Sequence, residues 1–178
     1  MNRPFEHRNL AMLLLQARES LMGLFRPILK EFSLTEQQWR IIRTLGDAPR
    51  HELEAGQIAK QCCILSPSLT GVLERMERDG LIRRMRPLAD QRKLIVSLTA
   101  KSLDLVAVIR PRIDAQYKQL EASLGPSVLG DLYSRLDRLI DAVPPAEDEV
   151  PAQQDAPPAK TSRRTRAKMS TSTEQEGY

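Results

Sequence analysis

One stretch in the middle of this chain constrains the fold more than any other. Ser66-Pro67 is typical of a helix start, an apolar stripe at helical spacing follows, and Asp79-Gly80 ends the helix. Two β-prone runs come next, at residues 81–86 and 94–98, and a long polar connection joins them. A helix of about 12 residues that leads directly into such a hairpin indicates a helix-turn-helix with a wing.

Amphipathic patterns predict helices on both sides of this stretch. Thr35 and Gln38 have the spacing of a capping box, and Leu34 and Trp39 sit where a hydrophobic staple would be. The predicted helices span about residues 8–31, 35–45, 53–62, 66–79, 99–124 and 126–143. The sequence therefore predicts a mainly α fold with a small β-hairpin wing: a winged helix-turn-helix part at about 35–98, flanked by helices at about 8–31, 99–124 and 126–143.

The C-terminal stretch differs in composition from the rest. Residues 144–178 contain five prolines and no Leu, Ile, Phe or Trp, so we expect a disordered tail behind a single domain at 1–143. The basic cluster at 163–168 could contact phosphates or be solvated. The tail holds five basic and six acidic residues, and the remaining 22 basic and 17 acidic residues give 1–143 a net charge of +5. That excess suits a nucleic-acid partner without requiring one.

The helix at 66–79 has the residue types that a DNA-reading helix needs. Small polar side chains near its N-terminus can approach base edges, and basic side chains further along can hold phosphates. Ser66, Ser68 and Thr70 fit the first role, and Arg75 and Arg78 fit the second. The alternative is that Ser66 only caps the helix and the arginines are solvated.

The hairpin carries a dense positive charge. Its basic residues are opposed within the hairpin only by Asp90, and such density is self-repelling without an anionic partner. We expect Arg92 to enter the minor groove with Asp90 bracing its guanidinium. The basic residues of the hairpin are Arg83, Arg84, Arg86, Arg92 and Lys93.

These residues resemble a known family. Asp90-Gln91-Arg92-Lys93 followed by Leu98-Thr99 looks like the wing of the multiple antibiotic resistance regulator (MarR) family, and Leu69-Thr70 through Gly80-Leu81 looks like its recognition helix. The segments 16–19, 25–29, 34–40 and 67–71 are more similar still to the branch that controls homoprotocatechuate degradation. The resemblance implies a winged helix-turn-helix DNA-binding part at about 35–98 and a helical dimerisation platform formed by about 8–31, 99–124 and 126–143. It also implies that the homodimer represses genes for degrading aromatic acids and is released by a pathway metabolite. An intramolecular helix pair is the alternative to the dimer.

An aromatic carboxylate would need a cation beside apolar walls. Arg18 and Met22 lie at the border of the apolar face of the first helix, and Trp39 on the next helix offers a stacking wall. Arg40 and Arg43 are further candidate cations. Arg18 could instead pair with an acid, and Trp39 could be plain core. Catechol-type and hydroxynicotinate-type acids both remain open as the effector.

Other functions fit the sequence less well. A redox sensor using Cys62 and Cys63 is the main alternative, but Lys60 is the only cation close in sequence to lower a thiol pKa. His7 and His51 have no acidic or cysteine neighbours at the spacing of metal ligands, so we expect no metal, no cofactor and no catalytic residues. Without a signal pattern or an apolar run of membrane length, we expect a cytoplasmic protein with no membrane partner.

Overall fold

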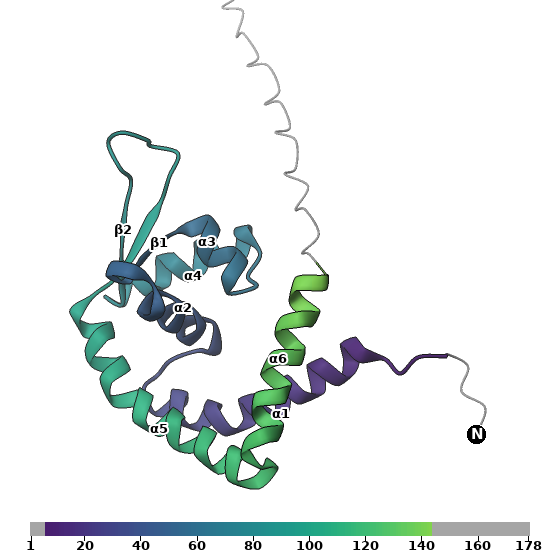
Figure 1. Cartoon of the computed structure of the whole chain (residues 1–178). Helices are drawn as coiled ribbons and strands as arrows, with labels where there is room; N and C mark the ends of the chain where they lie inside the picture. Colours follow the sequence, from purple (N-terminus) through teal and green to yellow (C-terminus); the bar gives the residue numbers. More distant parts are fainter. Residues whose placement is uncertain (1–5, 144–178) are drawn as a thin grey trace, which may run out of the picture. The chain divides into compact units, whose positions relative to one another are not determined.

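The computed structural model describes residues 6–143, which contain six α-helices, one short 3₁₀ helix and three strands (Figure 1). The predicted class, a mainly helical fold with a small wing, is confirmed. Residues 6–136 belong to one compact unit. None of the described helices is both long and apolar enough to cross a membrane. The elements are α1 (Leu10–Glu31), α2 (Glu36–Asp47), η1 (Pro49–His51), β1 (Glu52–Glu54), α3 (Ala55–Gln61), α4 (Ser66–Arg78), β2 (Ile82–Met85), β3 (Ile95–Leu98), α5 (Ala100–Leu124) and α6 (Pro126–Ala142).

The start of α2 follows the predicted capping box. The Gln38 backbone N–H donates to the Thr35 hydroxyl at 3.2 Å, and the Thr35 N–H donates to Oε1 of Gln38 at 2.9 Å. These two bonds satisfy donors that a helix start would otherwise leave unpaired. Leu34 and Trp39, on either side of the box, are both buried in the main core. The direction in which the chain enters α2 is therefore fixed locally.

The start of α4 differs from the prediction. Leu65, not Ser66, is the N-cap residue, and Ser66 is the first helical residue with no capping bond from its side chain. The helix begins one residue earlier than predicted, shortly after the turn that ends α3. Cys63 has a left-handed φ of 49°, and the N–H groups of Cys63 and Ile64 donate to the carbonyls of Lys60 and Ala59. This is the Schellman pattern of helix termination.

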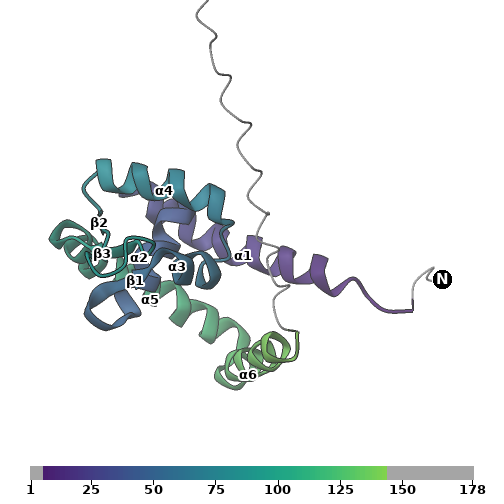
Figure 2. The same ribbon diagram turned by 90° about the horizontal axis from the view of Figure 1, so that it is seen from above.

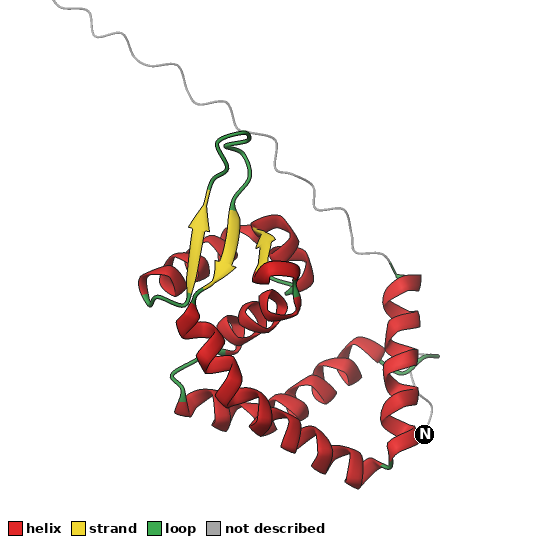
Figure 3. Cartoon of the chain, turned by 60° about the vertical axis from the view of Figure 1, so that its left-hand side comes forward, coloured by secondary structure: helices red, strands yellow, loops and turns green. Residues whose placement is uncertain are grey.

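The sheet has a strand that the sequence did not reveal. Its order is β1-β3-β2, all antiparallel, with Leu53 opposite Val96 and Arg84 opposite Val96 from the other side. β1 has three residues, two of them glutamates, so it lacks the β-branched or aromatic signal of a strand. It forms because β3 offers a free edge of backbone donors and acceptors. Figure 3 shows β2 and β3 in yellow with their connecting loop extending beyond the helices.

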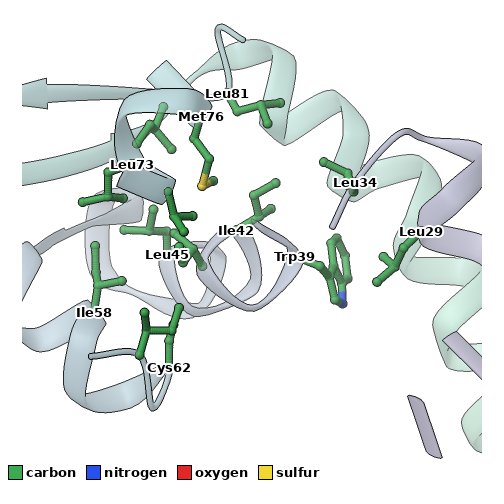
Figure 4. Close-up of a cluster of buried hydrophobic side chains, with 14 of the residues drawn as sticks. Leu29, Leu34, Trp39, Ile42, Leu45, Ile58, Cys62, Leu73, Met76 and Leu81 are labelled. Atoms are coloured by element: carbon green, nitrogen blue, oxygen red, sulfur yellow. The ribbon is translucent and has the colours of Figure 1, made fainter. Parts of the chain in front are cut away.

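The core lies under the helix-turn-helix. Ile42 and Leu45 of α2, Ile58 of α3, and Leu73 and Met76 of α4 are essentially inaccessible to solvent, and Figure 4 shows their side chains gathered together. Behind this cluster, α1 packs on α5, with the rings of Phe25 and Tyr117 5.2 Å apart. Helices α2, α3 and α4 and the sheet thus share one core. Helix α2 therefore packs directly against the helix-turn-helix.

Candidate nucleic-acid interface and effector groove

Helix α4 presents its polar side away from the core. Ser66, Ser68 and Thr70 are all exposed, and so are Arg75 and Arg78. The opposite face of the same helix is buried and holds it in place through Leu69, Val72, Leu73 and Met76. Figure 2 shows α4 along one edge of the part that α2, α3 and the strands form. A rigid helix with small polar residues at its exposed N-terminal end has the form that enters a major groove.

The wing loop is held by its own hydrogen bonds. Arg86 donates from Nη1 to the Gln91 carbonyl at 2.7 Å, and Gln91 donates from its side chain to the Pro87 carbonyl at 3.2 Å. The predicted contact between Asp90 and the Arg92 guanidinium does not form. Asp90 accepts from the Arg92 backbone N–H at 3.0 Å instead, since a carboxylate reaches the N–H two residues on more readily than the distant end of that side chain. The Arg92 side chain stays exposed.

Two further residues predicted to contact DNA, Arg84 and Lys93, form ion pairs within the protein. Nε of Arg84 lies 2.8 Å from Oε2 of Glu77, and the Arg84 backbone N–H donates to Oε1 of the same carboxylate at 3.0 Å. This hydrogen bonding lowers the pKa of Glu77. Nζ of Lys93 lies 2.7 Å from Oε1 of Glu54, a contact that raises the pKa of Lys93. These pairs tie the wing to α4 and β1.

The hairpin is therefore less self-repelling than its own sequence suggests. Glu77 and Glu54 come from α4 and β1 and offset two of its positive charges. Their role could not be read from the hairpin alone because Glu54 lies 39 residues before Lys93. Arg83, Arg86 and Arg92 remain exposed on the wing and, with Arg75 and Arg78, make up the basic part of the candidate DNA surface.

A cavity of about 420 Å³ lies between α2 and α5. Two of the predicted ligand residues, Trp39 and Arg43, are in its wall, and Trp39 is almost fully buried. The cavity is large enough for a single-ring ligand. An indole beside a guanidinium offers a stacking surface and a partner for a carboxylate. The full lining is Trp39, Arg43, Gly46, Asp47, His51, Leu103, Val106, Arg110, Ile113 and Asp114.

The other three candidate ligand residues lie outside this lining. Arg18 pairs with Glu36 and, at 2.6 Å, with Glu19. Arg18 was expected beside a ligand carboxylate, but the structure places it in an ion-pair network between α1 and α2. Met22 is half-buried and packs against the main core. Arg40 points to the end of α3, where its Nη1 donates to the Cys62 carbonyl at 2.7 Å.

Several lining residues were missed at the sequence level. Leu103, Val106, Arg110 and Ile113 recur at three- and four-residue spacing on α5, which is the pattern of one helix face. The sequence assigns this helix to the dimerisation platform and does not predict that it lines a ligand cavity. His51 is held in the wall by a bond of 3.0 Å between Nδ1 and the Gly46 carbonyl. Its position follows from the left-handed backbone of Arg50 and His51, which residue type alone does not predict.

Cys62 lacks the environment of a redox-sensing thiol. Cys62 is buried, and burial raises the pKa of its thiol, whereas a reactive thiol needs a lowered pKa. Its Sγ lies 3.4 Å from the Thr44 hydroxyl. Cys63 is exposed but occupies the αL position of the turn after α3. Within residues 6–143, no group of three or more His, Cys, Asp and Glu side chains could hold a metal ion.

A helix-turn-helix followed by a two-stranded wing and closed by a third strand defines a winged-helix protein. The MarR family sequence model matches residues 34–94, which run from α2 to the wing. The homoprotocatechuate degradative operon repressor of Escherichia coli is 43% identical over 145 residues, which cover 82% of this chain and 97% of that protein. The chain belongs to the MarR family, whose members are transcription regulators and not enzymes.

Other relatives agree with this assignment. The transcriptional regulator FarR of Neisseria gonorrhoeae is 42% identical over 78% of this chain and 95% of its own length. The solved structure of NadR in complex with 4-hydroxyphenylacetate has a TM-score of 0.70 and 41% identity, and it covers 78% of this chain and 97% of that one. The repressor CouR bound to a 23-mer DNA duplex has a TM-score of 0.66 and 25% identity, over 73% of this chain and 91% of that one.

Proposed function

We propose that this protein is a homodimeric repressor of an aromatic-catabolic operon. It binds a near-palindromic DNA operator and leaves it when a small aromatic acid binds between α2 and α5. The observation that carries the proposal is the placement of Trp39 and Arg43 in the cavity wall on the helix that packs against α3 and α4. The similarity to NadR, which was solved with 4-hydroxyphenylacetate, supports this choice of ligand class.

Exposed Ser68, Thr70 and Arg92 are the proposed contacts to DNA. The serine and threonine would read base edges in the major groove, and Arg92 would enter the minor groove beside it. Ser66 and Arg75 complete the surface of α4, and Arg86 supports the wing tip through Gln91. Arg84, Asp90 and Lys93 shape and brace the wing. CouR, a relative of the same fold, was solved on a DNA duplex.

Unpartnered apolar surface supports the dimer. Residues 126–142 form an amphipathic helix, yet none of them is buried in the single chain. The first half of α1 is exposed in the same way, although it is rich in leucine. A second copy related by a twofold axis would cover such faces. The exposed apolar residues include Leu10, Leu14 and Leu15 of α1, Leu124 of α5, and Val128, Leu132 and Tyr133 of α6.

Ligand binding can be tested on the purified protein without DNA. A ligand that binds only the folded state raises the melting temperature, so 4-hydroxyphenylacetate should do so in a concentration-dependent way. Arg43→Gln should weaken that ligand about two- to fivefold, because Arg43 is an exposed part of the cavity wall and an exposed charge pair contributes about 0.5 to 1 kcal/mol. Arg18→Gln is the matched control, since Arg18 is engaged with Glu36. Loss of binding in Arg18→Gln but not in Arg43→Gln would refute the assignment.

A further inference from the structure

Arg40 makes a contact that neither the cavity between α2 and α5 (the effector groove) nor the DNA surface explains. It lies on α2 directly after Trp39 and three residues before Arg43, but it does not line the cavity. Its Nη1 donates to the Cys62 carbonyl at 2.7 Å, a contact between residues 22 positions apart. Cys62 is the C-cap of α3, and the turn that follows it leads into α4. One side chain thus connects the helix of the groove to the turn of the helix-turn-helix.

The Cys62 carbonyl is a specific point of attachment. The Schellman pattern uses the carbonyls of Ala59 and Lys60 for the N–H groups of Ile64 and Cys63. The cap carbonyl of Cys62 accepts from the Arg40 guanidinium instead. A cation at the C-terminal end of a helix also interacts favourably with the helix dipole. The bond is therefore charge-assisted, and it fixes the last carbonyl before the chain turns toward α4.

A second contact from α2 reaches the same residue. Thr44 follows Arg40 by four positions and lies on the same face of α2, with its hydroxyl 3.4 Å from Sγ of Cys62. Nε of Arg40 is buried and has no hydrogen-bond partner among residues 6–143. Two side chains on one face of α2 therefore contact Cys62.

We infer that Arg40 is a positioning residue that transmits the state of the groove to the recognition helix through the Cys62 carbonyl. This inference rests on the proposed function, because it assumes that an effector binds at Trp39 and Arg43. Movement of α2 around a ligand moves Arg40 with it and shifts the turn from which α4 starts. The spacing and tilt of α4 then change without any change in its DNA-contacting side chains. Arg40 touches neither ligand nor DNA.

The test measures coupling rather than affinity alone. For the full-length protein, the DNA dissociation constant is measured with and without saturating 4-hydroxyphenylacetate on a duplex selected from a random pool. The ratio of the two constants is the coupling, which is typically about 5- to 150-fold in allosteric proteins. Arg40→Met removes the donors and keeps an unbranched side chain, so the ratio should fall at least about fivefold. Arg40→Lys, which keeps a donor and the charge, should restore part of it.

Two further variants separate this role from a merely structural one. Gln37→Met introduces a methionine, as Arg40→Met does, but at an exposed position of α2. It should leave the ratio of the two DNA dissociation constants unchanged. Thr44→Val removes the second contact to Cys62 and should lower the ratio less than Arg40→Met does. A structural residue would weaken DNA binding equally with and without the effector. An unchanged ratio in Arg40→Met would therefore overturn the inference.

Amide hydrogen exchange in the free protein tests the attachment without an effector. Arg40→Met should speed exchange at Cys63 and Ile64 relative to wild type, while exchange in β3 stays the same. Unchanged exchange at that turn would also overturn the inference. If 4-hydroxyphenylacetate fails to bind the wild-type protein, the proposed effector is refuted. The exchange experiment still decides whether Arg40 positions the turn.

Discussion

At the scale of single residues, several basic side chains differ in what they contact. Arg92 is exposed at the wing tip, whereas Arg84 is tied to Glu77 and Lys93 to Glu54. All three occur within ten positions and have the same type of charge, so sequence cannot separate them. They differ because Glu77 on α4 lies beside Arg84 and Glu54 on β1 lies beside Lys93. The electrostatic role of a residue depends on neighbours that only the fold supplies.

Arg92→Ala should weaken binding to specific and random duplexes alike and make the affinity less dependent on salt. Each phosphate or groove contact that is lost removes about one counterion-release contribution, so the slope of log K against log salt should fall by about one. Lys30→Ala, which removes an exposed charge at the end of α1, is the control. Fluorescence anisotropy at several salt concentrations gives both slopes. Equal slopes for Arg92→Ala and wild type would contradict a contact by Arg92.

The carboxylate of Glu77 should make stability sensitive to acid. Its hydrogen bond with Arg84 lowers its pKa below the ordinary value of 4.5, so folding favours the ionised form. The stabilisation is present above about pH 4.5 and is lost as the pH falls through the lower pKa of the folded state. The melting temperature should therefore fall less steeply below pH 4.5 in Glu77→Gln than in wild type. Identical pH profiles would show that this pair does not contribute.

At the scale of elements, the sequence predicted what short-range contacts determine. The start of α2 was predicted because Thr35 and Gln38 bond across three residues, and the end of α4 because Gly80 adopts a φ of 72°. β1 was missed because its three residues carry no strand signal and depend on pairing with β3. The bond from Arg40 to Cys62 was missed for the same reason, since it joins α2 to the end of α3. Sequence patterns therefore predicted most of the helices, but among the residues that line the effector groove they predicted only Trp39 and Arg43.

The exposed residues of α4 should determine which DNA sequence is preferred. Ser68→Ala or Thr70→Ala should change the preferred operator, at about 1 to 3 kcal/mol for each lost base contact. Binding to random duplexes should change little, because phosphate contacts supply most of that affinity. Selection from a random pool compares the preferences of the variants directly. A uniform loss over all sequences would mean that these residues only position α4.

At the scale of the whole molecule, the apolar face of α6 should hold two copies together. Leu132 is 42% exposed in the single chain. A second copy would bury it, so Leu132→Glu would place a charge in an apolar contact and should shift the dimer toward monomer. Light scattering after gel filtration should give about twice the chain mass of 20.2 kDa for wild type and a lower value for the variant. A wild-type protein that elutes at the monomer mass would rule out the proposed dimer.

The proposed regulation depends on one link, in which ligand binding between α2 and α5 lowers the affinity of α4 and the wing for DNA. The most direct measurement is the dissociation constant of the wild-type protein on its selected duplex, with and without saturating 4-hydroxyphenylacetate. The expected result is a constant at least about fivefold larger with the ligand, because a ligand shifts DNA binding by its differential affinity for the two conformations. In Arg43→Gln the same shift should need about two- to fivefold more ligand. If the ligand raises the melting temperature but leaves the DNA affinity unchanged, the proposed release of DNA by the ligand is contradicted.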